Sequence, residues 1–226
     1  MLTVAREVLT PAELAHCRDA LAGAAWVDGR ATAGAQSAKA KANLQLPENC
    51  AAASELGELI LAALRRSPAF LAAALPLKVF PPLFNRYDAG MGFGGHVDNA
   101  IRYGAGGARY RTDLSCTLFL SDPADYDGGE LVIEDAFGEP AVKLAAGDLA
   151  IYPATSVHRV ELVTRGSRLA SFFWVQSMVR RDDERALLAA LDAGIAEVRA
   201  ALGDEHRAAI GLTGAYHNLI RMWSET

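Results

Sequence analysis

Cysteine is scarce in this sequence, and long hydrophobic or basic runs are missing from it. The three cysteines, Cys17, Cys50 and Cys116, stand far apart and form no CxxC pair, which argues against a disulfide framework and against a thiolate zinc site. The longest apolar stretch, residues 69–77, contains Pro76 and is far shorter than the roughly 18 residues that a membrane helix needs. We therefore expect reduced thiols and no transmembrane segment.

Charge of one sign is not concentrated anywhere along the chain. Lys and Arg number 22 against 27 Asp and Glu, which gives a net charge of -5, so nucleic acid is not an expected partner. The first residues, Met1 to Glu7, lack the basic start, apolar stretch and cleavage site of a secretory signal. The sequence therefore predicts a cytoplasmic protein.

The 226 residues are 51% hydrophobic and 22% charged, which is typical of a folded domain. In residues 1–76, Thr10 followed by Pro11 and Glu13 predicts the start of a short helix. Residues 28–47 show no sustained period, and we expect loop and irregular strand there. Residues 51–75 return to a helical period with a break at Ser67-Pro68. This first region is expected to pack on the core.

Residues 77–178 carry short runs of β-branched and aromatic residues bounded by Gly, Pro or Asp. Eight strands at short spacing indicate a barrel or jelly roll. The predicted strands are residues 78–87, 95–98, 114–120, 129–133, 141–144, 148–152, 158–163 and 168–176.

Residues 179–226 are predicted to be helical. Apolar side chains recur three and four residues apart up to Leu202, and Gly203 ends that helix. Residues 216–223 predict a last helix. The apolar seam of the first helix, which comprises Leu188, Leu191, Ile195, Val198 and Leu202, must be covered. Packing against the barrel is the simpler interpretation, and a homo-oligomer through this helix is the alternative.

The residues with the clearest chemistry are His96 and Asp98. In an extended strand their spacing points both side chains to one face, so the imidazole and the carboxylate can share a cation. His158, at the start of another predicted strand, supplies a third ligand. Two histidines and one carboxylate form the facial triad of non-haem Fe(II), which leaves three coordination positions open.

Arg168 lies ten residues beyond His158, across the predicted turn 164–167. That turn would fold the Arg168 strand back alongside the histidine strand. A guanidinium inside a barrel of aromatic neighbours such as Phe172 and Trp174 would be an unpaired buried charge unless an anion joined it. The pattern therefore predicts an anionic ligand at Arg168.

With these residues in view, the sequence resembles the Fe(II)- and 2-oxoglutarate-dependent dioxygenases of the prolyl 4-hydroxylase type. It resembles most the bacterial PKHD-type hydroxylases, which include the iron-uptake factors of the PiuC kind. The resemblance covers nearly the whole chain and rests on Asn85-Arg86-Tyr87, residues 96–100, residues 111–115, residues 128–131 and His158-Arg159-Val160.

The resemblance implies an α+β fold with a double-stranded β-helix core, of the jelly-roll or cupin-like kind, flanked by N-terminal helices and a helical C-terminal tail. It implies that His96, Asp98 and His158 bind Fe(II) and that Arg168 pairs with the distal carboxylate of 2-oxoglutarate. Tyr87 is expected to donate a hydrogen bond to that carboxylate. O2 and a small-molecule or peptide substrate would complete the reaction, with L-ascorbate as auxiliary reductant.

Between Asn99 and Thr112, directly after the metal pair, the chain carries Arg102, Tyr103 and Arg109 among glycines. We interpret these three as candidate substrate contacts for an anionic or aromatic substrate, linked through the family to iron uptake. The alternative is a solvated hairpin tip. Two other functions use the same ligands: a barrel that senses 2-oxoglutarate or metal without catalysis, and a zinc hydrolase, which would need a further general base.

Overall fold

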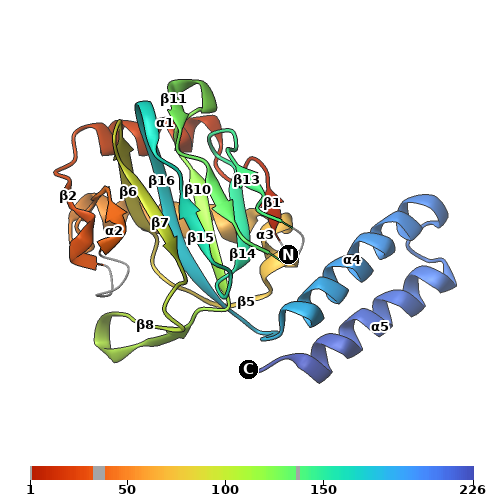
Figure 1. Ribbon diagram of the computed structural model, residues 1–226. Helices are drawn as coiled ribbons and strands as arrows, with labels where there is room; N and C mark the ends of the chain where they lie inside the picture. Colours follow the sequence, from red (N-terminus) through yellow and green to blue (C-terminus); the bar gives the residue numbers. More distant parts are fainter. Residues whose placement is uncertain (1, 33–38, 136–137) are drawn as a thin grey trace.

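The computed structural model describes residues 2–32, 39–135 and 138–226. Within these ranges two antiparallel sheets face each other, helices cover the outer side of the larger sheet, and a helical hairpin forms the C-terminus (Figure 1). This arrangement confirms the predicted α+β class with a double-stranded β-helix core.

The larger sheet is built around the long strand β16 (Val163–Ser177). Its order is β1 (Thr3–Ala5), β14 (Leu149–Pro153), β10 (Leu114–Phe119), β16, β6 (Leu83–Asp88), β4 (Leu44–Gln45) and β2 (Val27–Asp28), and β5 (Pro76–Val79) and β11 (Tyr126–Gly128) also pair with β16. The smaller sheet runs β13 (Ala141–Val142), β12 (Leu131–Ile133), β15 (His158–Val160), β7 (Gly92–His96) and β3 (Lys41–Ala42). Strands β8 (Ile101–Tyr103) and β9 (Arg109–Arg111) form a separate hairpin.

Each of the eight predicted strands overlaps an observed one, but the first prediction was wrong in its length. Residues 78–87 form two strands, β5 and β6, because Pro81 and Pro82 have no N–H to donate to a ladder. In residues 28–47 the structure has β2, a 3-10 turn, β3 and β4, while residues 33–38 lie outside the described part.

Side chains that alternate along the strands separate two interiors. Leu118 of β10, Ile151 of β14 and Phe173 of β16 pack outward against the helices. Their sequence neighbours Phe119, Ala150 and Tyr152 point between the two sheets. Because strand residues alternate faces, the even-numbered residues of β16 from Arg168 to Trp174 face the space between the sheets.

The predicted hairpin from His158 to Arg168 is wrong. Strand β15 pairs with β12 and β7, whereas β16 pairs with β6, β10, β11 and β5. Residues 161–162 carry the chain from the smaller to the larger sheet, and the predicted turn residues 164–167 belong to β16, where Gly166 is the register partner of Tyr126. His158 and Arg168 therefore face each other from opposite sheets.

The N-terminal helices begin where the sequence predicts. Helix α1 (Pro11–Ala22) has a capping box in which the Glu13 N–H donates to the Thr10 hydroxyl and the Thr10 N–H donates to the Glu13 carboxylate. Helix α2 (Ala51–Arg66) stops at Ser67, and α3 (Pro68–Ala74) starts at Pro68. Their buried faces form one core cluster with β10, β14 and β16.

The C-terminal helices α4 (Asp182–Leu202) and α5 (Arg207–Trp223) form an antiparallel hairpin that extends away from the sheets (Figure 1). Helix α4 packs mainly on α5 and touches α3, and only its first turns, from Asp182 to Ala189, line a small pocket with the larger sheet. The prediction that the whole apolar seam packs against the barrel is therefore wrong. The chain end returns to the sheets, where the Arg111 guanidinium donates to the Glu225 carboxylate over 2.6 Å. This contact ties the C-terminal end of α5 to strand β9.

The structure bears on two expectations drawn from the composition, namely reduced cysteines and the lack of a transmembrane segment. Cys17, Cys50 and Cys116 are free thiols, and burial raises the pKa of Cys17 to about 11. In the described part of the chain no helix has the length and apolarity needed to cross a membrane.

Candidate metal and cosubstrate site

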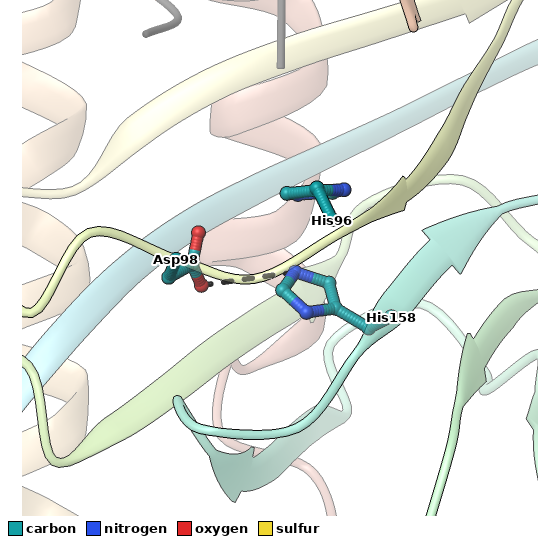
Figure 2. A group of neighbouring side chains, drawn as sticks. All are labelled: His96, Asp98 and His158. Atoms are coloured by element: carbon teal, nitrogen blue, oxygen red, sulfur yellow. Dashed lines mark ion pairs between the residues drawn. The ribbon is translucent and has the colours of Figure 1, made fainter. Parts of the chain in front are cut away.

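The two histidines of the predicted triad meet across one strand pair. His96 ends β7, His158 begins β15, and the two are register partners in the antiparallel ladder. Asp98 lies two residues beyond the end of β7, so the prediction that it sits within a strand is wrong. The three side chains nevertheless converge (Figure 2), with their ligand atoms within 4.8 Å of one another.

Both imidazoles are oriented by backbone carbonyls. His96 Nδ1 lies 2.9 Å from the Gly94 carbonyl oxygen, and His158 Nδ1 lies 3.1 Å from that of Ser156. A carbonyl oxygen only accepts hydrogen bonds, so each Nδ1 carries the proton and each Nε2 keeps a free lone pair. The lone pairs at Nε2 are the donors that a metal ion would use.

The metal-binding form of His96 is favoured by its surroundings. Burial lowers the pKa of His96 to about 4, with the neighbouring His158 as the next cause. The Phe93 ring stacks on the His96 ring with centroids 3.7 Å apart. At neutral pH the imidazole is therefore uncharged and available as a ligand.

The Asp98 carboxylate is fixed by Ser115 of the opposite sheet. Ser115 Oγ donates to Asp98 Oδ2 over 2.6 Å, and the same oxygen lies 3.7 Å from His158 Nε2. Ser115 comes from β10, whose neighbouring residues Leu114 and Cys116 face the helices. This hydrogen bond ties the third ligand to the larger sheet.

Replacing Ser115 by alanine is expected to weaken Fe(II) binding roughly 10-fold to 100-fold, the usual effect of losing a partner that orients a metal ligand. Metal titration of the purified variant measures it. Ser171→Ala is the matched control, because the buried Ser171 hydroxyl donates to the Leu83 carbonyl instead and should leave the affinity unchanged. Equal affinities in wild type and Ser115→Ala would contradict this role.

Arg168 is the largest of the described side chains that are less than 2% exposed, with 1% of it exposed. Its guanidinium lies 5.0 Å from the Phe119 ring centroid and 5.5 Å from that of Tyr87. Among the described residues none hydrogen-bonds to its Nε, Nη1 or Nη2. A buried cation with three unused donor nitrogens fits the carboxylate of a bound ligand.

The Arg168 side chain has a glycine on one side and two tyrosine hydroxyl groups nearby. Gly129 has φ +68°, and a Cβ there would come within 3.1 Å of Arg168 Cδ. Tyr87 is the register partner of Arg168; burial raises the pKa of its hydroxyl, while the charge of Arg168 lowers it. Tyr126, which the sequence did not single out, experiences the same two effects. Both hydroxyls therefore stay protonated and can donate.

The triad and Arg168 line one cavity that is partly open to solvent, and the space free of protein atoms in the cavity and its mouth is about 840 Å³. Buried polar atoms that lack a partner among the described residues gather along it: besides Arg168, these are both side-chain polar atoms of Asn43, Oδ1 of Asn85 and Nε of Arg102. Such atoms are costly without a ligand or water. The donor set therefore fits both a metal ion and an anionic cosubstrate.

The three candidate substrate residues are separated by the fold. Arg102 lines the cavity. Tyr103 is 69% exposed, and Arg109 is exposed and lies against the Tyr103 ring, so both are outside the cavity lining. Lys41, Asn43 and Asn85 also line the cavity but were not predicted as site residues, because a single polar residue on a strand or loop does not by itself indicate a site.

The arrangement disfavours a metal hydrolase. Among the described residues that line the cavity, Asp98 is the only acidic one. It is already one of the three ligand groups. A hydrolase would need a separate general base next to the metal-bound water.

Comparisons with known proteins agree with this geometry. Residues 82–176 match the 2OG-Fe(II) oxygenase superfamily, and residues 182–225 match the PKHD-type hydroxylase C-terminal domain. The chain is 63% identical to a PKHD-type hydroxylase of Methylobacterium nodulans and 59% identical to one of Gluconobacter oxydans, each over 100% of both chains.

Solved structures resemble the fold at lower identity. A prolyl-4-hydroxylase of Pseudomonas putida is 20% identical with a TM-score of 0.50, covering 78% of this chain and 92% of that one. HygX from Streptomyces hygroscopicus, with nickel and 2-oxoglutarate bound, is 17% identical with a TM-score of 0.51, covering 76% and 81%. At these identities the likeness establishes the fold.

Proposed function

The chain belongs to the PKHD-type hydroxylases, which are Fe(II)- and 2-oxoglutarate-dependent dioxygenases, and from this membership we propose which residues carry each part of the reaction. When bound, Fe(II) and 2-oxoglutarate supply an oxidation in which O2 hydroxylates the substrate and converts 2-oxoglutarate to succinate and CO2. The chain's own side chains bind, orient and exclude water.

His96, Asp98 and His158 hold the Fe(II) in this proposal. Support comes from their convergence within 4.8 Å and from the two Nε2 atoms left free by backbone hydrogen bonds at Nδ1. Three protein ligands leave further coordination positions for cosubstrate and O2. The Ser115 hydroxyl keeps the Asp98 carboxylate turned toward the histidines.

Arg168 binds the distal carboxylate of 2-oxoglutarate, and Tyr87 donates a hydrogen bond to it. The observation that carries this assignment is the buried guanidinium with three unpartnered nitrogens among the described residues. A carboxylate there would offset the cost of burying the charge. L-ascorbate, as auxiliary reductant, is part of the same proposal.

The primary substrate, a small molecule or a peptide, enters from the open side of the cavity, where Arg102 reaches it. Tyr103 and Arg109 would meet only a part of the substrate that extends beyond the opening. A role in iron uptake remains the hypothesis that the family suggests. No residue described above selects a prolyl or lysyl side chain.

The proposed organisation has residues 77–178 as the dioxygenase barrel, with residues 1–76 packed on it and residues 179–226 as a helical segment. Helices α4 and α5 expose Leu187, Leu202, Ile210 and Met222, which supports self-association through this segment as homo-oligomerisation. The three free thiols favour a reducing compartment such as the cytoplasm.

Oxygen-electrode and succinate measurements test the catalytic proposal against a non-catalytic sensor. With Fe(II) and 2-oxoglutarate, the enzyme is expected to consume O2 and form succinate in equal amounts. Removing the metal with a chelator should abolish both, Fe(II) should restore them, and Zn(II) should not. Binding of 2-oxoglutarate with neither O2 consumption nor succinate would contradict the enzyme and favour the sensor.

A further inference from the structure

Arg102 is held over the cavity by aromatic side chains. It lies in β8, four residues after Asp98, with its guanidinium carbon 4.4 Å from the Trp174 ring centroid and 5.3 Å from that of Phe80. Tyr110 of β9 packs edge-on against Phe80, with centroids 5.2 Å apart. Stacking occupies the face of the guanidinium and leaves its N–H edge for a planar anion.

Lys41 brings a second cation to the same cavity from β3. Only 7% of it is exposed, its Nζ lies 5.4 Å from the Phe93 ring centroid, and it donates to Gln45 Oε1 over 2.7 Å. Burial lowers the pKa of Lys41 to about 8, and the charge of Arg102 is the next cause. The charges of Asp98, Asp28 and Glu48 act in the opposite direction. Lys41 and Arg102 both line the cavity, and an anion between them would reduce their repulsion.

Arg102 lies away from the proposed cosubstrate carboxylate at Arg168. Trp174, on which Arg102 stacks, follows Arg168 by six residues on the same face of β16. Six residues of extended strand span about 20 Å. One molecule of 2-oxoglutarate, with five carbons, is too short to contact both ends.

Formal charges indicate what the end of the cavity near Arg102 would bind. The charges of Fe(II) and Arg168 are balanced by those of Asp98 and the 2-oxoglutarate dianion. Asp98 is the only acidic side chain among the described residues that line the cavity. A further anion would neutralise the positive charge that Arg102 brings to the cavity, while the charge of Lys41 is balanced in part by Asp98, Asp28 and Glu48.

We propose that Lys41 and Arg102 form a carboxylate-binding subsite for the primary substrate, whose apolar part packs against Trp174 and Phe172 and presents a C–H bond to the metal. This inference rests on the proposed function. It names the substrate class as a carboxylic acid, and it adds Lys41 as a specificity-determining residue.

Binding of paired probes tests the subsite without turnover. The 2-oxoglutarate site is first saturated with Mn(II) and N-oxalylglycine, and calorimetry then measures phenylacetate, butyrate and their uncharged amides. At least one carboxylate is expected to bind 10-fold or more tightly than its amide, because only the carboxylate pairs with both cations. Lys41→Met and Arg102→Met should each remove this preference, while Lys41→Arg should keep it.

Lys78→Met and Arg65→Met are the matched controls, since both residues are exposed and lie outside the cavity lining. Equal binding of every carboxylate and its amide in the wild type would overturn the subsite. So would a preference that survives both cavity variants, or a Lys41→Met variant that loses affinity for N-oxalylglycine itself.

Failure of the proposed function would look different. A carboxylate preference that depends on Lys41 and Arg102, in an enzyme that forms no succinate from 2-oxoglutarate, would support the anion subsite and overturn the dioxygenase assignment of the site residues.

Discussion

Arg168→Met is expected to raise the KM for 2-oxoglutarate at least 100-fold. Methionine keeps much of the side-chain volume but removes the guanidinium, whose three nitrogens have no partner among the described residues. Losing one partner of a buried, hydrogen-bonded charge pair costs about 3–5 kcal/mol, and each 1.4 kcal/mol is about tenfold in an equilibrium constant. Succinate formation at varied 2-oxoglutarate concentrations measures the change.

The thermal stability of the ligand-free Arg168→Met variant should not fall, although its affinity for 2-oxoglutarate does. Without ligand, Arg168→Met removes a buried charge that lacks a partner, so its unfolding temperature should be no lower than that of the wild type. Saturating 2-oxoglutarate should raise the unfolding temperature of the wild type only. Arg165→Met is the control on the same strand, because Arg165 is exposed and paired with Asp127. A variant that loses stability but keeps its 2-oxoglutarate affinity would assign Arg168 a structural role.

His158→Ala is expected to abolish stable Fe(II) binding and to lower succinate formation at least about 1000-fold. The variant loses one of three protein ligands, and the remaining His96 and Asp98 lie on one short segment and supply only two ligand atoms. Because the oxidation requires bound Fe(II), succinate formation should fall in proportion to the iron content. Iron content after desalting and succinate formation measure both effects.

The matched control is His217→Ala, which removes an exposed histidine of α5 far from the cavity lining. It should keep iron and activity at wild-type levels. Thermal unfolding of His158→Ala in the absence of metal separates loss of a ligand from loss of the fold. A folded His158→Ala variant with normal iron content and turnover would remove His158 from the ligand set.

The sequence predicted the triad because its signal is partly local. His96 and Asp98 are two residues apart, and His158 begins a recognisable strand, so residue type and spacing were sufficient to group them. The strand register that places His158 opposite His96, and Arg168 opposite Tyr87, had no sequence signature. Register depends on how two sheets close over one core, which one short segment does not encode.

The prediction of a hairpin between His158 and Arg168 failed for the same reason, because strand pairing depends on how the two sheets close. A Gly-containing turn between two apolar runs favours a hairpin, yet here Glu161 and Leu162 cross from one sheet to the other. Lys41 and Ser115 were missed for a related reason. Each is one polar residue in a segment without other chemistry, and only the closing of the two sheets brings it to the cavity.

The C-terminal helices show a further limit of sequence patterns. The apolar spacing along residues 182–202 predicted a helix with a covered seam, and α4 confirms the helix. The spacing did not reveal that α5 packs against most of this apolar seam. Nor could it show that Glu225 returns to Arg111, at the base of the hairpin that carries Arg102.

Anaerobic titration of the purified enzyme with Fe(II) and 2-oxoglutarate tests most directly whether the triad and Arg168 form one site. We expect a visible metal-to-ligand charge-transfer band that saturates with one 2-oxoglutarate per iron and yields succinate when O2 is admitted. His96→Ala should show no band, and Arg168→Met should need at least 100-fold more 2-oxoglutarate to reach it. A band that forms equally well in either variant, or none in the iron-loaded wild type, would contradict the account.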